Sequence, residues 1–212
     1  NFAHLHVHTE YSMLDGAARV TDLVTEAARQ EMPAVAITDH GNLFGAFDFY
    51  KQAKKVGIKP IIGIESYVAP ETRFDKRKVQ WAQGGEDDVS GGGSYTHMTI
   101  LAETNEGLAN LFRLSSLASL EGFYYKPRID RELLSKYGKG LIGTTGCPGG
   151  EIQTRLRMGN YKDAVKAAAE FRDLFGAGNF FVELMDHDLD IEKRVKEDLL
   201  DRKSTRLNSS HT

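Results

Sequence analysis

The sequence predicts an α/β fold, because short apolar segments typical of strands alternate with longer segments of helical periodicity. The predicted strands cover residues 2–8, 34–38, 60–68, 96–102, 140–144 and 180–185. The predicted helices cover residues 18–31, 43–56, 106–120, 131–137, 161–175 and 191–200. This alternation indicates a parallel sheet, and six such units favour an incomplete barrel over an open sheet.

Each element follows from a local pattern. Residues 2–8 alternate with period two, and the later strands are short apolar runs such as AVAIT at 34–38. In the helical segments apolar residues recur every three or four positions, as Val20, Val24 and Ala27 show. Gly57 is expected to end the second helix, since glycine readily adopts the left-handed conformation of a helix C-terminus.

Residues 70–94 form a long connection between two predicted strands. Its first half carries Arg73, Lys76, Arg77 and Lys78, which we interpret as a solvated charge run rather than a phosphate-binding segment. Its second half contains GGEDDVSGGG, and we predict that Gly84–Gly93 is the least ordered internal stretch.

Composition limits the classes of protein and partner. The 212 residues suit one domain, and the single cysteine excludes an internal disulfide and fits the reducing cytoplasm. A net charge of −3 argues against bulk nucleic-acid binding, and we expect no membrane partner.

Residues 201–212 (DRKSTRLNSSHT) look foreign to the rest, so we assign the domain to residues 1–200 and expect the chain to be a fragment.

Potential metal ligands recur at or near the ends of the predicted strands. His6 and His8 lie on one side of a strand, and Asp15 follows at a turn. Asp39 and His40 follow the second predicted strand, where Asp39 either orients a histidine ligand or caps a turn.

Three further candidates come from later segments. Glu65 interrupts an apolar strand, so it needs a metal or a basic partner. His97 lies near the start of its strand rather than the end, which fits a barrel site less well. Cys147 occupies a glycine-flanked turn, where it could be a zinc ligand, a nucleophile or inert packing.

Together these residues indicate a site for two or more divalent metals that hydrolyses phosphoesters. The segment Asp186-His187-Asp188 resembles a calcium loop, but Ile191 replaces the glycine that such a loop requires. We therefore exclude a calcium site there.

Five segments carry a family resemblance: HLHVHTEYSMLDGA, AVAITDHGNLFGAFDFYKQAKKVGIKPIIGIESYVA, YTHMTILAETNEGLANLFRLSSLAS, GFYYKPRIDRELLSKYGKGLIGTTGCPGGEI and FFVELMDH. Over about residues 2–200 the chain resembles the N-terminal PHP (polymerase and histidinol phosphatase) domain of bacterial DNA polymerase III alpha subunits. The resemblance implies a distorted seven-stranded βα barrel of the PHP type, incomplete at the C-terminus here. It also implies two or three metals, zinc or manganese, in a complete site.

The resemblance also assigns residues to roles. It implies metal binding by His6, His8, Asp15, His40, Glu65, His97 and Cys147, with Asp15, His40 and Glu65 acting in catalysis. The family's last motif, Asp-x-His, has no counterpart in this chain, so we expect the fragment to bind fewer metals and to hydrolyse DNA ends poorly. Restoring that motif is expected to raise solubility, metal content and nuclease rate.

The function implied is 3′–5′ exonuclease proofreading at a DNA 3′ end, within a DNA-directed DNA polymerase. The partners implied are the remainder of the alpha subunit and other replisome subunits. Three alternatives stay open: a structural or docking module without catalysis, a free-standing phosphatase such as histidinol phosphatase, and an enzyme with Cys147 as nucleophile.

Overall fold

The computed structural model describes residues 2–79 and 91–200. The tail 201–212 lies outside the described residues, as does most of the glycine-rich stretch 84–93 that was predicted to be least ordered. The described strands are β1 (Ala34–Ile37), β2 (Lys59–Val68), β3 (Thr96–Ala102), β4 (Arg128–Ile129), β5 (Leu141–Thr144) and β6 (Phe180–Phe181). The described helices are α1 (Val20–Arg29), α2 (Ala46–Val56), α3 (Asn105–Leu120), α4 (Arg131–Tyr137), α5 (Glu151–Arg157), α6 (Tyr161–Phe175) and α7 (Asp190–Leu200).

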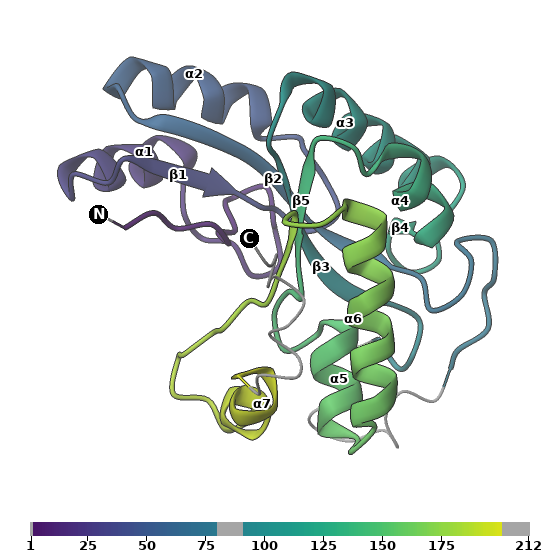
Figure 1. Ribbon diagram of the computed structural model, residues 1–212. Coiled ribbons are helices and arrows are strands. Elements are labelled where there is room, and N and C mark those ends of the chain that lie inside the picture. The colour runs from purple at the N-terminus through teal and green to yellow at the C-terminus, as the bar shows by residue number, and fades with distance from the viewer. Residues whose placement is uncertain (1, 80–90, 201–212) are drawn as a thin grey trace.

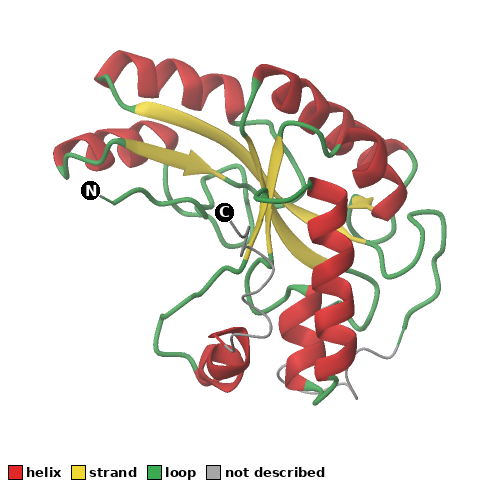
Figure 2. Ribbon diagram, viewed as in Figure 1, coloured by secondary structure: helices red, strands yellow, loops and turns green. Residues whose placement is uncertain are grey.

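The strands form one curved sheet with the order β1-β2-β3-β5-β6, and β4 pairs with β2 (Figure 1). Helices α1 and α2 cover the β1 end of the sheet, and α3, α4 and α6 cover the rest of its outer side (Figures 1 and 2). Two apolar cores result. One packs α1 and α2 on β1, and a larger one packs α3 to α7 around β2, β3, β5 and β6.

The prediction of a wholly parallel sheet is wrong. The pairs β1–β2, β2–β4 and β5–β6 are parallel, but β3 runs antiparallel to both β2 and β5. Parallel neighbours need a crossover connection, usually a helix. The described parts of the connection between β2 and β3 contain no helix, so β3 returns directly beside β2.

The N-terminal segment is not a regular strand, contrary to prediction. It runs beside β1, where Ala36 N donates to His4 O at 2.9 Å and Thr38 N donates to Val7 O at 2.8 Å. Between these two hydrogen bonds the β1 segment advances two residues, from 36 to 38, while the N-terminal segment advances three, from 4 to 7. The extra residue is a bulge that interrupts the hydrogen-bond ladder. The bulge leaves His6 and His8 free to turn toward the inner face of the sheet.

Strand β6 is also shorter than predicted, ending at Phe181. Thr145 N, just after β5, donates to Phe181 O. The next amide of this segment that could pair with β5, Glu183 N, donates to the Thr145 side chain instead of to a carbonyl, so the strand ends there.

The bounds of β3, α4 and α6 agree with prediction, and Gly57 ends α2 with a φ of 80° as expected. Helix α5 and strand β4 were not predicted.

The sheet does not close into a barrel, which confirms the incomplete architecture. A cleft of about 1020 Å³ lies between residues 2–6 at one edge and residues 181–187 at the other. His6 and Glu183 lie on its wall, so the cleft reaches the inner face where the predicted ligands gather. None of the helices in the described residues combines the length and apolar character needed to span a membrane.

Candidate metal centre

Glu65 forms the middle of the site. Side chains alternate along β2, so Ile64 and Val68 enter the apolar core while Glu65 and Tyr67 face the other side. The Glu65 side chain is only 1% exposed. A buried carboxylate is costly unless it is paired, so its surroundings determine whether this arrangement is stable.

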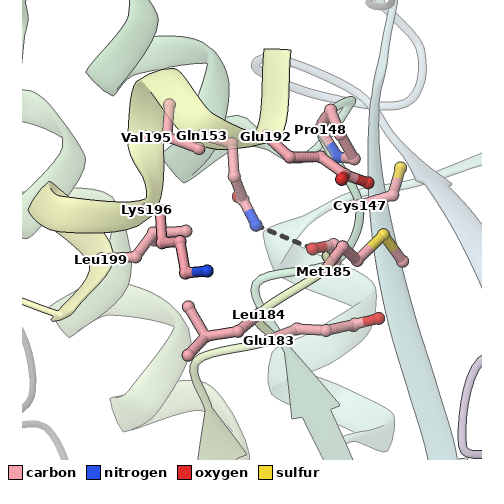
Figure 3. A pocket seen from close by; sticks show the side chains of 11 residues that line it. Cys147, Pro148, Gln153, Glu183, Leu184, Met185, Glu192, Val195, Lys196 and Leu199 are labelled. Carbon is pink, nitrogen blue, oxygen red and sulfur yellow. Dashed lines mark hydrogen bonds between the residues drawn. The ribbon is translucent and has the colours of Figure 1, made fainter. Parts of the chain in front are cut away.

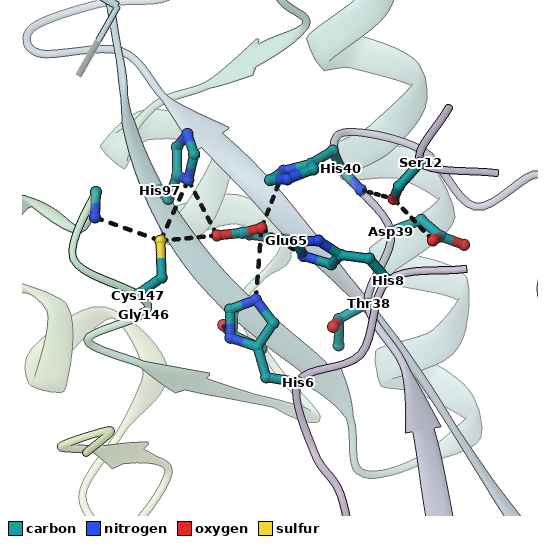
Figure 4. A network of polar contacts seen from close by, with 12 residues as sticks. His6, His8, Ser12, Thr38, Asp39, His40, Glu65, His97, Gly146 and Cys147 are labelled. Atoms are coloured by element: carbon teal, nitrogen blue, oxygen red, sulfur yellow. Dashed lines mark hydrogen bonds and ion pairs between the residues drawn. The ribbon is translucent and has the colours of Figure 1, made fainter. Parts of the chain in front are cut away.

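Five nitrogen and sulfur donors surround that carboxylate (Figure 4). Oε2 of Glu65 lies 3.4 Å from Nε2 of His6, 2.8 Å from Nε2 of His8 and 2.9 Å from Nδ1 of His40. Oε1 lies 3.0 Å from Nδ1 of His97 and accepts a hydrogen bond from the Cys147 thiol at 3.0 Å. Residues from four separate segments of the sequence therefore meet at the Glu65 carboxylate.

Asp15 lies at the exposed rim of this cluster, as expected. Its side chain is 49% exposed, and Oδ2 lies 2.9 Å from Nε2 of His40 and 3.2 Å from Nδ1 of His8. A tight turn brings it there, with Asp15 N and Gly16 N both donating to Ser12 O.

His97 reaches the site because of the antiparallel direction of β3. The start of β3 lies beside the end of β2, with Tyr67 paired to His97 in the register. The same residue anchors the Cys147 turn, since His97 N donates to Gly149 O at 2.9 Å. The position of His97 at a strand start is thus compatible with a site at the ends of β1 and β2.

The loop after β1 holds His40 in place through glycine. Gly41 has a φ of +64°, and its N donates to Glu65 O at 2.9 Å. A Cβ at Gly41 would lie 2.9 Å from the Tyr67 ring. Only glycine suits both the left-handed backbone and this close approach.

Asp39 orients a loop rather than an imidazole. Its carboxylate accepts hydrogen bonds from Thr9 N at 2.6 Å, Thr9 Oγ1 at 2.8 Å and Ser12 Oγ at 2.8 Å. Ser12 Oγ in turn accepts from His40 N at 3.0 Å. Asp39 therefore fixes the turn that carries Asp15 and, through Ser12, the backbone of His40.

The electrostatics of the cluster favour a charged carboxylate. Burial would raise the pKa of Glu65, but the surrounding imidazoles of His40, His6, His8 and His97 hold it well below its usual range. Burial would lower the pKa of His6, but the carboxylates of Glu183 and Glu65 outweigh this and raise that pKa to about 10. Without metal, His6 is thus protonated at neutral pH, and binding of a cation there would release that proton.

The donor set fits divalent metals. Nε2 of His8, Nδ1 of His40 and Oε2 of Glu65 are buried without a hydrogen bond of suitable geometry, although each of the two nitrogens lies within 3 Å of Oε2. A shared cation would give each of these atoms a partner. Three overlapping groups have ligand atoms within 4.8 Å of one another: His6, His8 and Glu65; His8, Asp15 and His40; and His40, Glu65 and His97.

Glu183 belongs to the site and was not predicted. Its Oε1 lies 2.7 Å from Nδ1 of His6, and its Oε2 accepts a hydrogen bond from Thr144 Oγ1. A carboxylate behind a ligating histidine fixes the ring and its tautomer. The available signal was the same as for Glu65, an acid within an apolar strand-like run.

We expect Glu183→Gln to lower the affinity of the chain for Zn²⁺ or Mn²⁺ by about 10- to 100-fold, because His6 loses its charged partner. Calorimetric titration measures the affinity, and far-UV circular dichroism checks the fold. Glu197→Gln, an exposed position on α7, is the matched control. Unchanged affinity in Glu183→Gln would show that the contact has no role in metal binding.

Helix α7 lies behind Cys147 and Glu183 (Figure 3). A cavity of about 20 Å³, room for roughly one water, separates them from Glu192, Val195 and Lys196 of that helix.

The two remaining described histidines lie outside the cluster. His4 packs on Phe2, and Nδ1 of His187 lies 2.7 Å from Glu192.

A buried carboxylate ringed by imidazoles and a thiol, on the inner face of an open α/β sheet, is a donor set typical of metal-binding α/β proteins. A family model described as "PHP domain" matches residues 4–187. The chain belongs to the PHP domain family.

Its relatives agree with the resemblance seen in the sequence. The chain is 62% identical to "DNA polymerase III subunit alpha" of Saccharopolyspora erythraea over 208 residues, 94% of this chain and 17% of that protein. It is 56% identical to the protein of the same name from Mycobacterium tuberculosis over 204 residues, 95% of this chain and 17% of that protein. The chain thus spans 17% of the length of these relatives.

A solved structure described as a putative metal-dependent phosphoesterase from Bifidobacterium adolescentis is 17% identical. The match covers 83% of this chain and 56% of that one, with a TM-score of 0.33. This likeness is too low to carry an argument about function.

Proposed function

We propose that the chain is the PHP domain of a bacterial replicative DNA polymerase III alpha subunit in the cytoplasm. In this proposal its metal centre hydrolyses phosphodiester bonds at a DNA 3′ end, as a 3′–5′ exonuclease. The observation that carries the proposal is the buried Glu65 carboxylate with four imidazoles and one thiol around it.

In this proposal seven residues hold the metals, namely His6, His8, Asp15, His40, Glu65, His97 and Cys147. Imidazole and thiolate donors favour zinc, and manganese is the other candidate. Divalent metals bound here would activate water and stabilise the charge of a phosphoryl transition state.

The chain's own residues divide the remaining tasks. Glu65 holds its negative charge in the buried centre, where it keeps the four imidazoles turned inward. Asp15 and His40 form the exposed end, where Oδ2 of Asp15 lies within hydrogen-bond reach of Nε2 of His40. Asp15, whose carboxylate is 49% exposed at this end of the centre, would accept the proton of an attacking water.

We assign the domain to residues 1–200. The cleft between residues 2–6 and 181–187 separates the two edges of the sheet, which agrees with a barrel that is not closed. The alternative with Cys147 as nucleophile has less support, because burial and the Glu65 charge raise the pKa of the thiol well above its usual range.

The test is release of nucleotides from a 3′-labelled single strand by a complete alpha subunit that carries these residues, without deoxynucleotides. We expect EDTA to abolish release and His8→Ala or His40→Ala to lower it at least about 100-fold, since each removes a ligand. His4→Ala, outside the cluster, is the control and should match wild type.

Two results would count against the proposal. Release that persists in EDTA would favour Cys147 as nucleophile. Metal binding without release, even at mismatched 3′ ends, would favour a structural or docking module.

A further inference from the structure

A short strip of lysines and aromatic rings extends from the metal centre along the segment before β4. We define it by four residues: Lys78, Tyr125, Lys126 and Tyr67. Tyr67 is buried and its ring stacks on His40, with centroids 5.8 Å apart and an interplanar angle of 16°. The inner end of the strip is therefore in contact with a candidate ligand of the centre.

Lys126 is held above that inner end. Its Nζ lies 5.5 Å from the centroid of the Tyr67 ring, on the residue that stacks on His40. A lysine over an aromatic face is attracted by the ring's quadrupole while its remaining donors stay available. Lys126 thus places a positive charge one ring away from the cluster of acids and imidazoles.

Tyr125 and Lys78 continue the strip outward. Nζ of Lys78 lies 5.5 Å from the Tyr125 ring, and that tyrosine is 64% exposed. Tyr125 adopts a φ of 60°, an outlier for a bulky residue, in a tight turn where Tyr124 N donates to Lys126 O at 3.0 Å. Backbone outliers of this kind are concentrated at functional positions, and the Tyr125 ring rests against Tyr124 with centroids 4.5 Å apart while most of it stays exposed.

The charges of the strip are not neutralised by acids in the described part of the chain. Among residues 2–79 and 91–200 the contacts of Lys78 and Lys126 are with tyrosine rings, whereas Arg77 nearby pairs with Asp75. Two cations that have no acid partner among the described residues, interleaved with an exposed ring, match the chemistry of a single strand, in which phosphates alternate with stacking bases.

We propose that this strip binds a single-stranded nucleic acid and guides its end into the metal centre, with Lys126 and Lys78 on phosphates and Tyr125 stacked on a base. The inference rests on the proposed function, since it names how the substrate strand reaches that site. Lys126 and Tyr125 are positioning residues and touch no reacting atom.

The test is fluorescence anisotropy of a 5′-labelled dT8 strand with the 212-residue chain in EDTA, so that hydrolysis plays no part. We expect Tyr125→Ala to weaken binding about tenfold, since each stacked base contributes strongly. Lys126→Gln should weaken it several-fold and reduce the salt slope by about 0.7, the value for one lost phosphate contact. Lys126→Arg should bind as wild type.

Lys166→Gln, an exposed lysine on α6, is the matched control and should leave binding unchanged. The strip assignment is overturned if Tyr125→Ala and Lys126→Gln bind dT8 as wild type does, or if the wild-type chain shows no saturable binding. Unchanged dT8 binding by both variants would indicate that the strip contacts a protein partner instead of a nucleic acid. If dT8 binding behaves as expected but the nucleotide-release assay shows no hydrolysis, only the proposed exonuclease function is contradicted. The failure of the strip assignment and the failure of the proposed function can therefore be told apart.

Discussion

Replacing Glu65 with glutamine is expected to lower the affinity of the chain for Zn²⁺ or Mn²⁺ by at least about 100-fold, since residues that only support a ligand already cost 10- to 100-fold. Glutamine keeps the shape of the side chain but removes the charge that faces three imidazoles through Oε2 and a fourth through Oε1. The change should therefore affect every metal of the cluster together.

Calorimetric titration at pH 7.5 measures this loss, with far-UV circular dichroism to show that the fold persists. Glu106→Gln, an exposed position at the start of α3, should bind metal as wild type does. Near-normal affinity in Glu65→Gln would mean that the metals bind elsewhere.

Replacing Arg128 with methionine is expected to have the largest effect on stability, about 4 kcal/mol of unfolding free energy. Arg128 is completely buried and donates to the carbonyl oxygens of Gly122, Ser94, Arg73 and Asp75 at 2.9–3.1 Å. Methionine fills a similar volume but leaves four buried acceptors without their charged donor. Through these hydrogen bonds Arg128 connects the segments that precede β3 and β4 with the segment that follows β2.

Urea denaturation of the metal-free chain measures the change. Arg29→Met, on the exposed side of α1 where Arg29 pairs with Glu26, should leave stability close to that of wild type, because solvent screens an exposed ion pair. A cost below about 1 kcal/mol for Arg128→Met would show that water readily replaces the guanidinium at these carbonyls.

The elements that the sequence predicted best have strong local patterns. The bounds of β3, α4 and α6 agree with prediction because their apolar periodicity is complete and their ends carry clear signals, such as Asp130, whose side chain accepts from Leu133 N at the start of α4. The N-terminal segment failed because its bulge depends on the register with β1, which no local pattern encodes.

The candidate ligands were recognisable because histidines, acids and a cysteine at strand ends are unusual residues in unusual places. Their convergence was harder to foresee. His97 enters from the start of its strand because β3 is antiparallel to β2, and this direction depends on tertiary pairing. Glu183 lies inside the predicted strand 180–185 and carried the same signal as Glu65, but its contact with His6 depends on tertiary packing.

The measurement that tests the central claim most directly is anomalous X-ray diffraction from crystals of the chain grown with Mn²⁺ or Zn²⁺. We predict at least two anomalous peaks around Glu65, with protein nitrogen and oxygen ligands at roughly 2.0–2.2 Å. Those ligands should come from His6, His8, Asp15, His40, Glu65 and His97, with the Cys147 sulfur as the remaining ligand. Full metal occupancy with no peak near Glu65, or a crystal in which the imidazoles contact only the carboxylate at saturating metal, would contradict the assignment of this cluster as a metal centre.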